Sequence, residues 1–143
     1  MKWIGPFKID EILNNIVDGN IVMPPVSNSV YMVFQKPWVN TPDLNSEPLY
    51  VGSNTGKSKR FRTRIGDLIA DMFGFYGGGT GHHSGGKHLN EYCIKNKLNP
   101  KEMYIGWLEY SECQRCDENY LYNNLNPKLN RSKPPKCKIH NID

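Results

Sequence analysis

Two tyrosines in short apolar segments are the first residues of this chain whose type and placement could support phosphate chemistry. Tyr31 ends the segment Ser29-Val30-Tyr31, and Tyr50 begins the segment Tyr50-Val51-Gly52. A tyrosine hydroxyl can orient a phosphate or a water, but its free pKa of about 10 means that a basic role needs nearby cations. Tyrosines in strands are more often packing residues, and this alternative stays open.

Positive charge is concentrated in two segments, although the formal net charge of the chain is only +4. The first segment holds five cations in eight residues without an acid: Lys57, Lys59, Arg60, Arg62 and Arg64. The second lies in the tail: Lys128, Arg131, Lys133, Lys136 and Lys138. Such clusters favour a polyanionic partner, because phosphate contacts gain from counterion release. A solvated lysine-rich surface is the alternative.

Glu118 is the most informative single position. Helical spacing places it on one face with Leu121, Tyr122 and Leu125. A carboxylate on an apolar face is costly to bury without a partner, so the pattern predicts a metal ion or an arginine beside Glu118. The alternative is a partly exposed acid paired with a surface lysine.

The cysteines and histidines offer a second group of candidate ligands. Cys113-x2-Cys116 and Cys137-x2-His140 have the spacing of zinc ligands. Helical geometry puts Cys113 and Cys116 on the side opposite Glu118, so a structural Zn²⁺ there would leave the carboxylate undisturbed. We expect reduced thiols without a metal in preference to this zinc site, because a CxxC inside a helix is an unusual zinc motif.

His82 and His83 lie in the glycine-rich segment 74–86. Glycines let the backbone approach a ligand closely, and successive N–H groups can face an anion. A plain surface loop is the alternative interpretation of this segment.

The elements that must position these residues follow from periodicity and turn signals. We expect helices at about 8–18 and 59–73, from Leu89 to Asn99, and from a capping box at Ser111 and Gln114 to Pro127. We expect strands at 30–34, 49–51 and 103–110, a long loop at 35–48 and a basic, flexible tail at about 131–143.

This order predicts an α/β (α+β) fold, with a small three-stranded antiparallel sheet flanked by helices in a single domain of residues 1–143. No apolar run is long enough to span a bilayer, and the N-terminus lacks the features of a signal peptide. We therefore expect a cytosolic (cytoplasmic) protein without a membrane partner.

The ordered set of motifs resembles the GIY-YIG nuclease family. Ser29-Val30-Tyr31 resembles its first motif, Tyr50-Val51-Gly52 its second, and Glu118, Pro127 and Asn130 follow in the family's order across about residues 28–131. The resemblance implies a metal-dependent phosphodiesterase that cuts double-stranded DNA. Because the chain is compact, it looks most like the family's restriction endonucleases, which implies sequence-specific cutting and a possible homodimer.

The resemblance also assigns roles. Glu118 would hold Mg²⁺ (or Mn²⁺), Tyr31 would activate or position the attacking water, and Tyr50 would orient the group around it. An arginine would neutralise the phosphate; Arg64 is chosen over Arg60 and Arg62 because it borders the apolar stripe of its helix and precedes an apolar residue. The family's histidine falls at Leu68 here, so His83, or else His82, would replace it.

The residues expected to contact DNA are Lys57, Lys59, Arg60, Arg62, His82, Asn130 and Arg131, with Asn130 supporting either the site or the DNA strand. The chain departs from the family pattern in starting the first motif with Ser29 and in having a longer loop at 35–48. This loop, the glycine-rich segment and the basic tail would together read bases. Two other functions stay open: a DNA-binding module of this fold without catalysis, and a structure-specific nuclease of repair or recombination with a zinc-bound tail.

Overall fold

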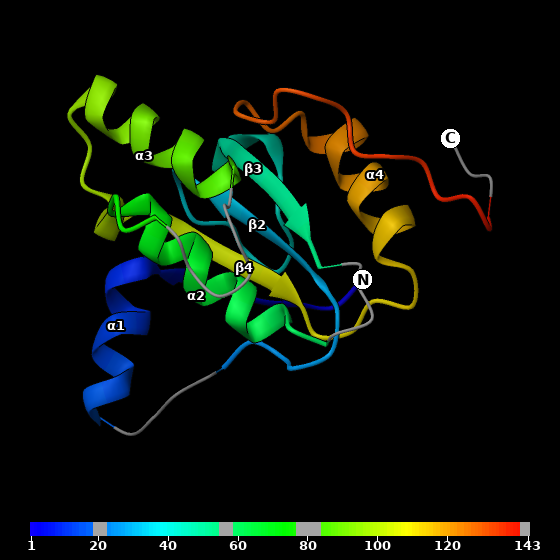
Figure 1. The fold of residues 1–143 in the computed structure, drawn as a ribbon, viewed down its shortest axis with the longest axis horizontal. Helices are drawn as coiled ribbons and strands as arrows, with labels where there is room; N and C mark the ends of the chain where they lie inside the picture. Colours follow the sequence, from blue (N-terminus) through cyan, green and yellow to red (C-terminus); the bar gives the residue numbers. More distant parts are fainter. Residues whose placement is uncertain (19–22, 55–58, 77–83, 141–143) are drawn as a thin grey trace.

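The computed structural model describes residues 1–18, 23–54, 59–76 and 84–140 (Figure 1). Lys57, His82 and His83 lie outside these ranges. The fold is mixed α/β with a four-stranded antiparallel sheet. The strands are β1 (Trp3–Lys8), β2 (Val30–Phe34), β3 (Pro48–Ser53) and β4 (Tyr104–Leu108), in the order β1-β4-β2-β3.

The predicted count of three strands was therefore wrong by one, because β1 was missed. Pro6 argues against a strand in so short a segment, since proline cannot donate to a ladder. In the structure β1 is an edge strand that pairs with β4, and its register shifts between Ile4 and Phe7. Proline is tolerated at such an edge. The three strands that were predicted are all present.

The helices are α1 (Ile9–Asp18), α2 (Phe61–Met72), α3 (Ser84–Asn96) and α4 (Gln114–Leu125), with short 3₁₀ turns at Leu44–Ser46 and Pro100–Glu102. Helix α3 begins earlier than predicted, because its glycine-rich first turn packs closely against neighbours (below). The capping box predicted for α4 does not form. Cys113 is the N-cap, Ser111 donates instead to the Asp117 carboxylate, and the Gln114 amide donates to the carbonyl of Asn28.

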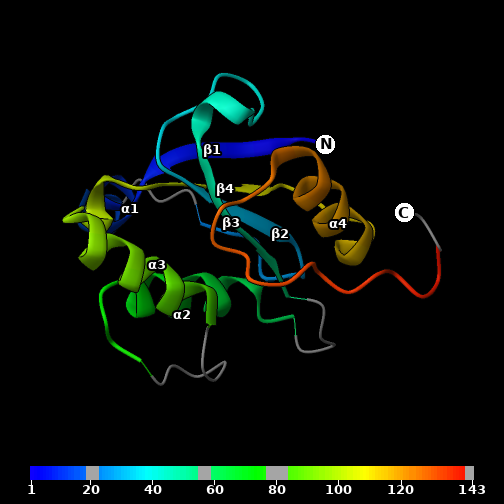
Figure 2. The same ribbon diagram turned by 90° about the horizontal axis from the view of Figure 1, so that it is seen from above.

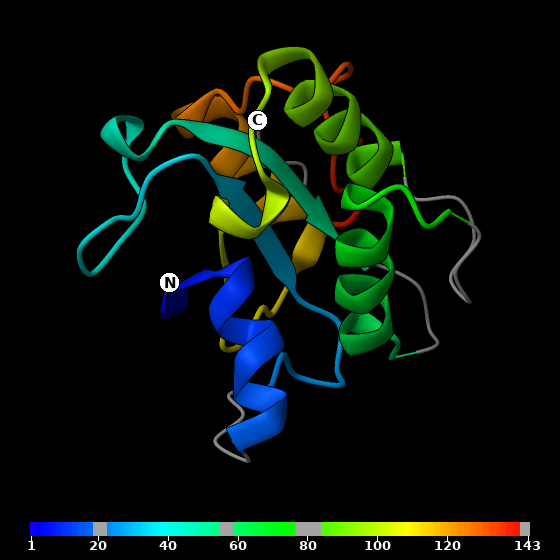
Figure 3. The same ribbon diagram turned by 90° about the vertical axis from the view of Figure 1, so that its left-hand side faces the viewer.

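The sheet separates two layers of helices (Figure 2). Helices α2 and α3 lie side by side over one face (Figure 3), and α4 covers the other. Strand alternation explains the two cores. Tyr31 and Val33 belong to the cluster beneath α2 and α3, whereas Val30, Met32 and Phe34 pack with Leu121 of α4.

The outer edge of β3 is covered by the segment that follows α4. The N–H of Lys128 donates to the carbonyl of Pro48 (3.1 Å), and the N–H of Leu129 donates to that of Leu49 (2.7 Å). The side-chain amide of Asn130 then accepts from the N–H of Val51 (2.9 Å) and donates to its carbonyl (3.0 Å). This segment therefore satisfies backbone groups that an edge strand would leave unpaired.

The long loop 35–48 joins the end of β2 to the start of β3. Its Trp38 is buried and packs in the cluster on the α4 side of the sheet. The loop lies at one end of the β2–β3 hairpin and Ser53 at the other, separated by the length of β3, roughly 16 Å at about 3.3 Å per residue. Within the described ranges, no helix has the length and apolar character needed to cross a membrane.

Candidate active site

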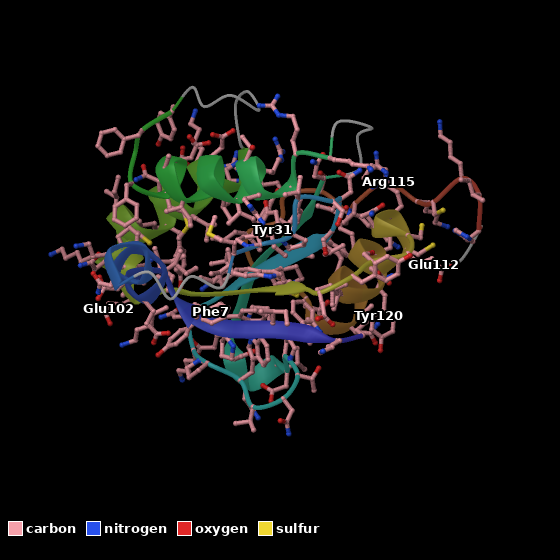
Figure 4. All side chains as sticks on the ribbon, turned by 90° about the horizontal axis from the view of Figure 1, so that it is seen from below. Phe7, Tyr31, Glu102, Glu112, Arg115 and Tyr120 are labelled. Atoms are coloured by element: carbon pink, nitrogen blue, oxygen red, sulfur yellow. The ribbon has the colours of Figure 1, made fainter. Side chains whose placement is uncertain are left out.

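Tyr31 and Tyr50 lie on adjacent strands, as predicted. Tyr31 pairs with Gly52 across the hairpin, and Val33 pairs with Tyr50. The two rings stack with centroids 6.2 Å apart and an interplanar angle of 29°. Tyr31 is almost fully buried, between the sheet and α2 (Figure 4), whereas Tyr50 is half-buried. The two hydroxyl-bearing side chains therefore share one face of the hairpin.

Two glycines make room for these rings. A Cβ on Gly52 would lie 2.4 Å from the Tyr31 hydroxyl oxygen, and a Cβ on Gly85 would lie 2.4 Å from Cζ of Tyr50. Each ring thus rests directly on backbone, Tyr31 across β3 and Tyr50 against the first turn of α3. This close approach explains why glycine follows Tyr50-Val51 and why position 85 in the first turn of α3 is a glycine, whereas a Cβ on Gly86 would lie 2.5 Å from Cβ of Asp71.

Glu118 reaches the same end of the hairpin from α4. Its Oε2 accepts a hydrogen bond of 2.6 Å from the hydroxyl of Ser53, the last residue of β3. Strand alternation places Ser53 on the same face as Val51, which packs in the cluster on the α4 side. Among the described residues, Oε1 of Glu118 has no hydrogen-bond donor, so this oxygen can receive a cation.

Burial is the largest influence on Glu118 and raises the pKa of its carboxyl above the ordinary 4.5. The Ser53 hydrogen bond and the charges of Arg115 and Arg64 act in the opposite direction and lower this pKa. Desolvation disfavours the ionised form, and donors or cations favour it. Glu118 is thus a half-buried carboxylate for which a neighbouring cation is favourable.

Tyr31 does not have the lowered pKa that a phenolate would require. Burial first, and then Tyr50, raise the pKa of Tyr31 well above the ordinary value of 10.0. The charge of Arg64 lowers it and that of Glu118 raises it, both less strongly than burial. The charge of Arg64 therefore does not offset the effect of burial on Tyr31, and at neutral pH the side chain is a neutral hydroxyl.

The three candidate arginines on or next to α2 differ in their surroundings. Arg64 is half-buried, and among the described residues it is the one whose charge lowers the pKa of both Tyr31 and Glu118. Arg62 is exposed, and its Nε donates to the carbonyl of Pro24 (2.8 Å). Arg60 is exposed at the N-cap of α2. Arg64 is therefore the arginine that lies with the tyrosine and the carboxylate.

Lys59, Asn130, Arg131 and Leu68 are the other residues of the sequence analysis on which the described part of the chain bears. Lys59 is exposed just before α2, and Arg131 is exposed and pairs with Glu91 (3.6 Å). The side-chain amide of Asn130 hydrogen-bonds to the N–H and to the carbonyl of Val51 on β3. Leu68, at the position of the family's histidine, is fully buried.

Sequence reasoning missed Ser53, Arg115 and Gly85. Alternation along β3 could have placed Ser53 on the α4 face, and Arg115 precedes Glu118 by three residues on one helix, a spacing at which side chains are neighbours. Gly85 carried no usable signal, because its role depends on where the Tyr50 ring lies.

The four candidate zinc ligands come together at the start of α4. The candidate ligand atoms of Cys113, Cys116, Cys137 and His140 all lie within 4.8 Å of one another, so the group could bind a metal such as Zn²⁺. N–H donors from His140 and Ile139 lower the pKa of Cys137 to about 6, whereas the hydrogen bond with Cys113 is the main cause that raises the pKa of Cys116 to about 12. Without a metal, the cluster therefore favours one thiolate at Cys137.

Comparisons of the chain with protein-family models, with curated proteins and with solved structures find no match. The resemblance to a nuclease family therefore depends on the ordered motifs themselves.

Proposed function

We propose that this chain is a Mg²⁺-dependent DNA endonuclease that resembles the GIY-YIG family, most like its compact restriction enzymes. One observation carries the proposal. Tyr31 on β2, Arg64 on α2 and Glu118 on α4 come to the same end of the hairpin, close enough for Arg64 and Glu118 both to alter the pKa of Tyr31. A buried hydroxyl, a guanidinium and a carboxylate together suit the hydrolysis of a phosphodiester.

The residues at this end of the hairpin fit a hard divalent cation. Mg²⁺ prefers oxygen ligands and is commonly held by one or two carboxylates, several waters and substrate phosphates. Glu118 supplies one carboxylate, Ser53 fixes its Oε2, and Oε1 is available among the described residues. When bound, such an ion would stabilise negative charge at the scissile phosphate and on the leaving oxygen.

The protein side chains have separate roles in this proposal. Arg64 neutralises a non-bridging phosphate oxygen, for which a guanidinium fork is well matched. Tyr31, as a neutral phenol, orients the attacking water or the phosphate by hydrogen bonding and does not remove a proton itself. Tyr50 stacks on Tyr31 and keeps its hydroxyl in position.

A basic groove offers a path for the DNA backbone. A cavity of about 540 Å³ lies between α3 and the segment after α4, and its lining includes Lys95, Lys128, Asn130 and Arg131 together with one acid, Glu91, which pairs with Arg131. It adjoins the edge of β3 through Asn130, whereas the loop 35–48 lies at the far end of the hairpin. We therefore assign DNA contacts to the groove and to the start of α2 in preference to the loop 35–48. We assign the cutting of both strands to a homodimer or to two successive nicks.

The structure also gives a reason to keep the non-catalytic alternative. Leu68 is buried where the family has a histidine, and Ser29 is fully buried, with its hydroxyl donating to the carbonyl of Leu108 (2.8 Å). Both departures from the family pattern thus serve packing. A DNA-binding module without catalysis would bind DNA in a salt-dependent manner and leave it uncut.

Supercoiled plasmid incubated with the purified chain tests the proposal. We expect nicked or linear products with Mg²⁺ or Mn²⁺ and none with EDTA. Discrete linear fragments would support sequence-specific cutting, and faster cutting of branched than of linear duplexes would favour the repair-type nuclease. Binding without cutting under all divalent ions would refute the nuclease and favour the binding module.

A further inference from the structure

We propose that Cys113, Cys116, Cys137 and His140 form a structural Zn²⁺ site that fastens the tail to the start of α4. This site is separate from the carboxylate of Glu118. Glu118 contacts β3 through Ser53, whereas Cys116 contacts the tail through His140. The proposal does not depend on nuclease activity.

The spacing of the ligand atoms matches a zinc tetrahedron. Zn–S bonds of about 2.3 Å and Zn–N bonds of about 2.0–2.1 Å place neighbouring ligand atoms roughly 3.5–3.8 Å apart. The Sγ atoms of Cys113 and Cys137 are 3.6 Å apart, and Nδ1 of His140 lies 3.4 Å from Sγ of Cys116 and 3.2 Å from that of Cys137. The other pairs of ligand atoms lie within 4.8 Å, so one ion could bond all four atoms after small shifts of the side chains.

A disulfide does not account for this arrangement. Bonded sulfurs lie about 2.05 Å apart, far closer than Cys113 and Cys137, and a disulfide gives no role to the histidine. Three sulfurs and an imidazole nitrogen that converge on one point are instead the ligand set of a closed Cys₃His site.

The local backbone also suits a metal. Cys113 is the N-cap of α4 and Cys116 lies in its first turn, so this CxxC begins the helix and is not enclosed within it. Cys137 and His140 flank a turn, and the N–H of His140 donates to Sγ of Cys137 (3.4 Å). Such N–H···S bonds orient and stabilise thiolate ligands. The reason for preferring unligated thiols, a CxxC inside a helix, therefore does not hold.

The ion would close the segment between Cys116 and Cys137 into a loop. Glu118 and Asn130 both lie in this segment. The amide of Asn119 already joins α4 to the tail through the carbonyl of Pro135 (2.7 Å), and Figure 1 shows the tail returning beside α4. Thiolate and imidazole ligands select Zn²⁺ over Mg²⁺, so the chain would hold two metals of different chemistry in separate places.

Metal analysis of the full chain, purified with a reductant and supplied with Zn²⁺, tests the site. We expect one zinc per chain, and thiolate-to-metal charge-transfer bands after exchange with Co²⁺. Zinc should be lost, or held at least tenfold more weakly, in Cys116→Ser and in His140→Ala. Cys93→Ala is the matched control, because Cys93 is a buried cysteine of the core outside the cluster, and it should keep the metal.

His140 is exposed, so His140→Ala keeps the test decisive if Cys116→Ser fails to fold. A wild-type chain that binds no zinc under these conditions would overturn the proposal. So would a Cys113–Cys137 disulfide, detected by mass spectrometry in place of the metal, or a zinc content that is unchanged in His140→Ala. Zinc bound by wild type and lost in the two variants would support it, whether or not the chain cuts DNA.

Discussion

Ser53 and Glu118 join the end of β3 to α4 through a hydrogen bond of 2.6 Å from a hydroxyl to a carboxylate oxygen. This bond places the carboxylate beside the strand whose Gly52 backbone supports the ring of Tyr31. Tyr31, on the face beneath α2 and α3, and Glu118, on the face covered by α4, thus lie at the same end of the hairpin, where the charge of Glu118 raises the pKa of Tyr31. The proposed chemistry depends on this arrangement.

Removing the Ser53 hydroxyl should move the pH dependence of DNA cleavage. Glu118 must be ionised to hold a cation, and its pKa is raised by burial, so activity should fall as the pH drops through a value above 4.5. The Ser53 hydrogen bond lowers this pKa. Ser53→Ala should therefore raise it further and shift the acid limb of the rate profile to higher pH.

Cleavage rates between pH 5 and 8 at fixed Mg²⁺ measure this shift. Ser53→Thr keeps a hydroxyl and is the matched control. Identical acid limbs for Ser53→Ala and wild type would show that the bond does not set the ionisation of the carboxylate.

A methyl group at Gly52 should displace Tyr31. The added Cβ would lie 2.4 Å from the hydroxyl oxygen of a ring that is packed against Phe61 and Tyr50. Overpacking of this kind costs about 1–3 kcal/mol, so Gly52→Ala should lower stability and abolish cleavage.

Gly66→Ala is the matched control for this prediction. Gly66 lies on the exposed side of α2, with nothing within 4 Å of an added Cβ, so its replacement should stabilise the helix by about 0.5–1 kcal/mol. Chemical denaturation of both variants provides the comparison. Equal effects at the two glycines would contradict the close approach of Tyr31 to β3.

Tyr31→Phe separates chemistry from packing. The ring and its contacts with Tyr50 and Phe61 stay, whereas the hydroxyl is lost. We expect cleavage to fall by about 10²-fold or more, with stability within about 1.5 kcal/mol of wild type. A variant that cuts as fast as wild type would leave Tyr31 as a packing residue only.

The arginines of α2 should differ in what they do. Arg64→Ala should reduce the cleavage rate by about 10²–10³-fold, because its charge would no longer face the phosphate. Arg60→Ala, at an exposed position, should mainly weaken DNA binding. The slope of log affinity against log salt concentration should fall by about one, as for the loss of one phosphate contact. Rates and affinities at several salt concentrations distinguish the two. The reverse pattern would make Arg60 the arginine of the site.

Much of the fold followed from local patterns. Strand β2 was predicted with its observed bounds, because a short apolar run between turn signals has few other interpretations. The apolar stripe of α2 is buried at Phe61, Ile65, Leu68 and Met72, as helical periodicity indicated. These two predictions succeeded because every residue of the apolar run or stripe fits the same periodic pattern.

The features that failed depend on tertiary contacts. β1 contains a proline and forms a strand by pairing with β4, and the glycines at the start of α3 make room for the Tyr50 ring at Gly85 and for Asp71 at Gly86. Glu118 was found from its place on an apolar face, but its partner Ser53 lies 65 residues away in the chain. The pKa of Tyr31 could not be anticipated, because burial outweighs the nearby cations that the sequence makes conspicuous.

The most direct test of the central claim compares wild type with Glu118→Gln in Mg²⁺-dependent cleavage, with DNA affinity and thermal stability measured on the same preparations. The glutamine keeps the size of the side chain and an oxygen for Ser53, but it removes the charge that would hold the metal.

Because burial raises the Glu118 pKa, wild type loses stability as the pH rises through that pKa. The variant should therefore be at least as stable as wild type near pH 7. The proposal predicts that Glu118→Gln folds and binds DNA but does not cut it. Cleavage by Glu118→Gln at the wild-type rate would contradict the proposed site.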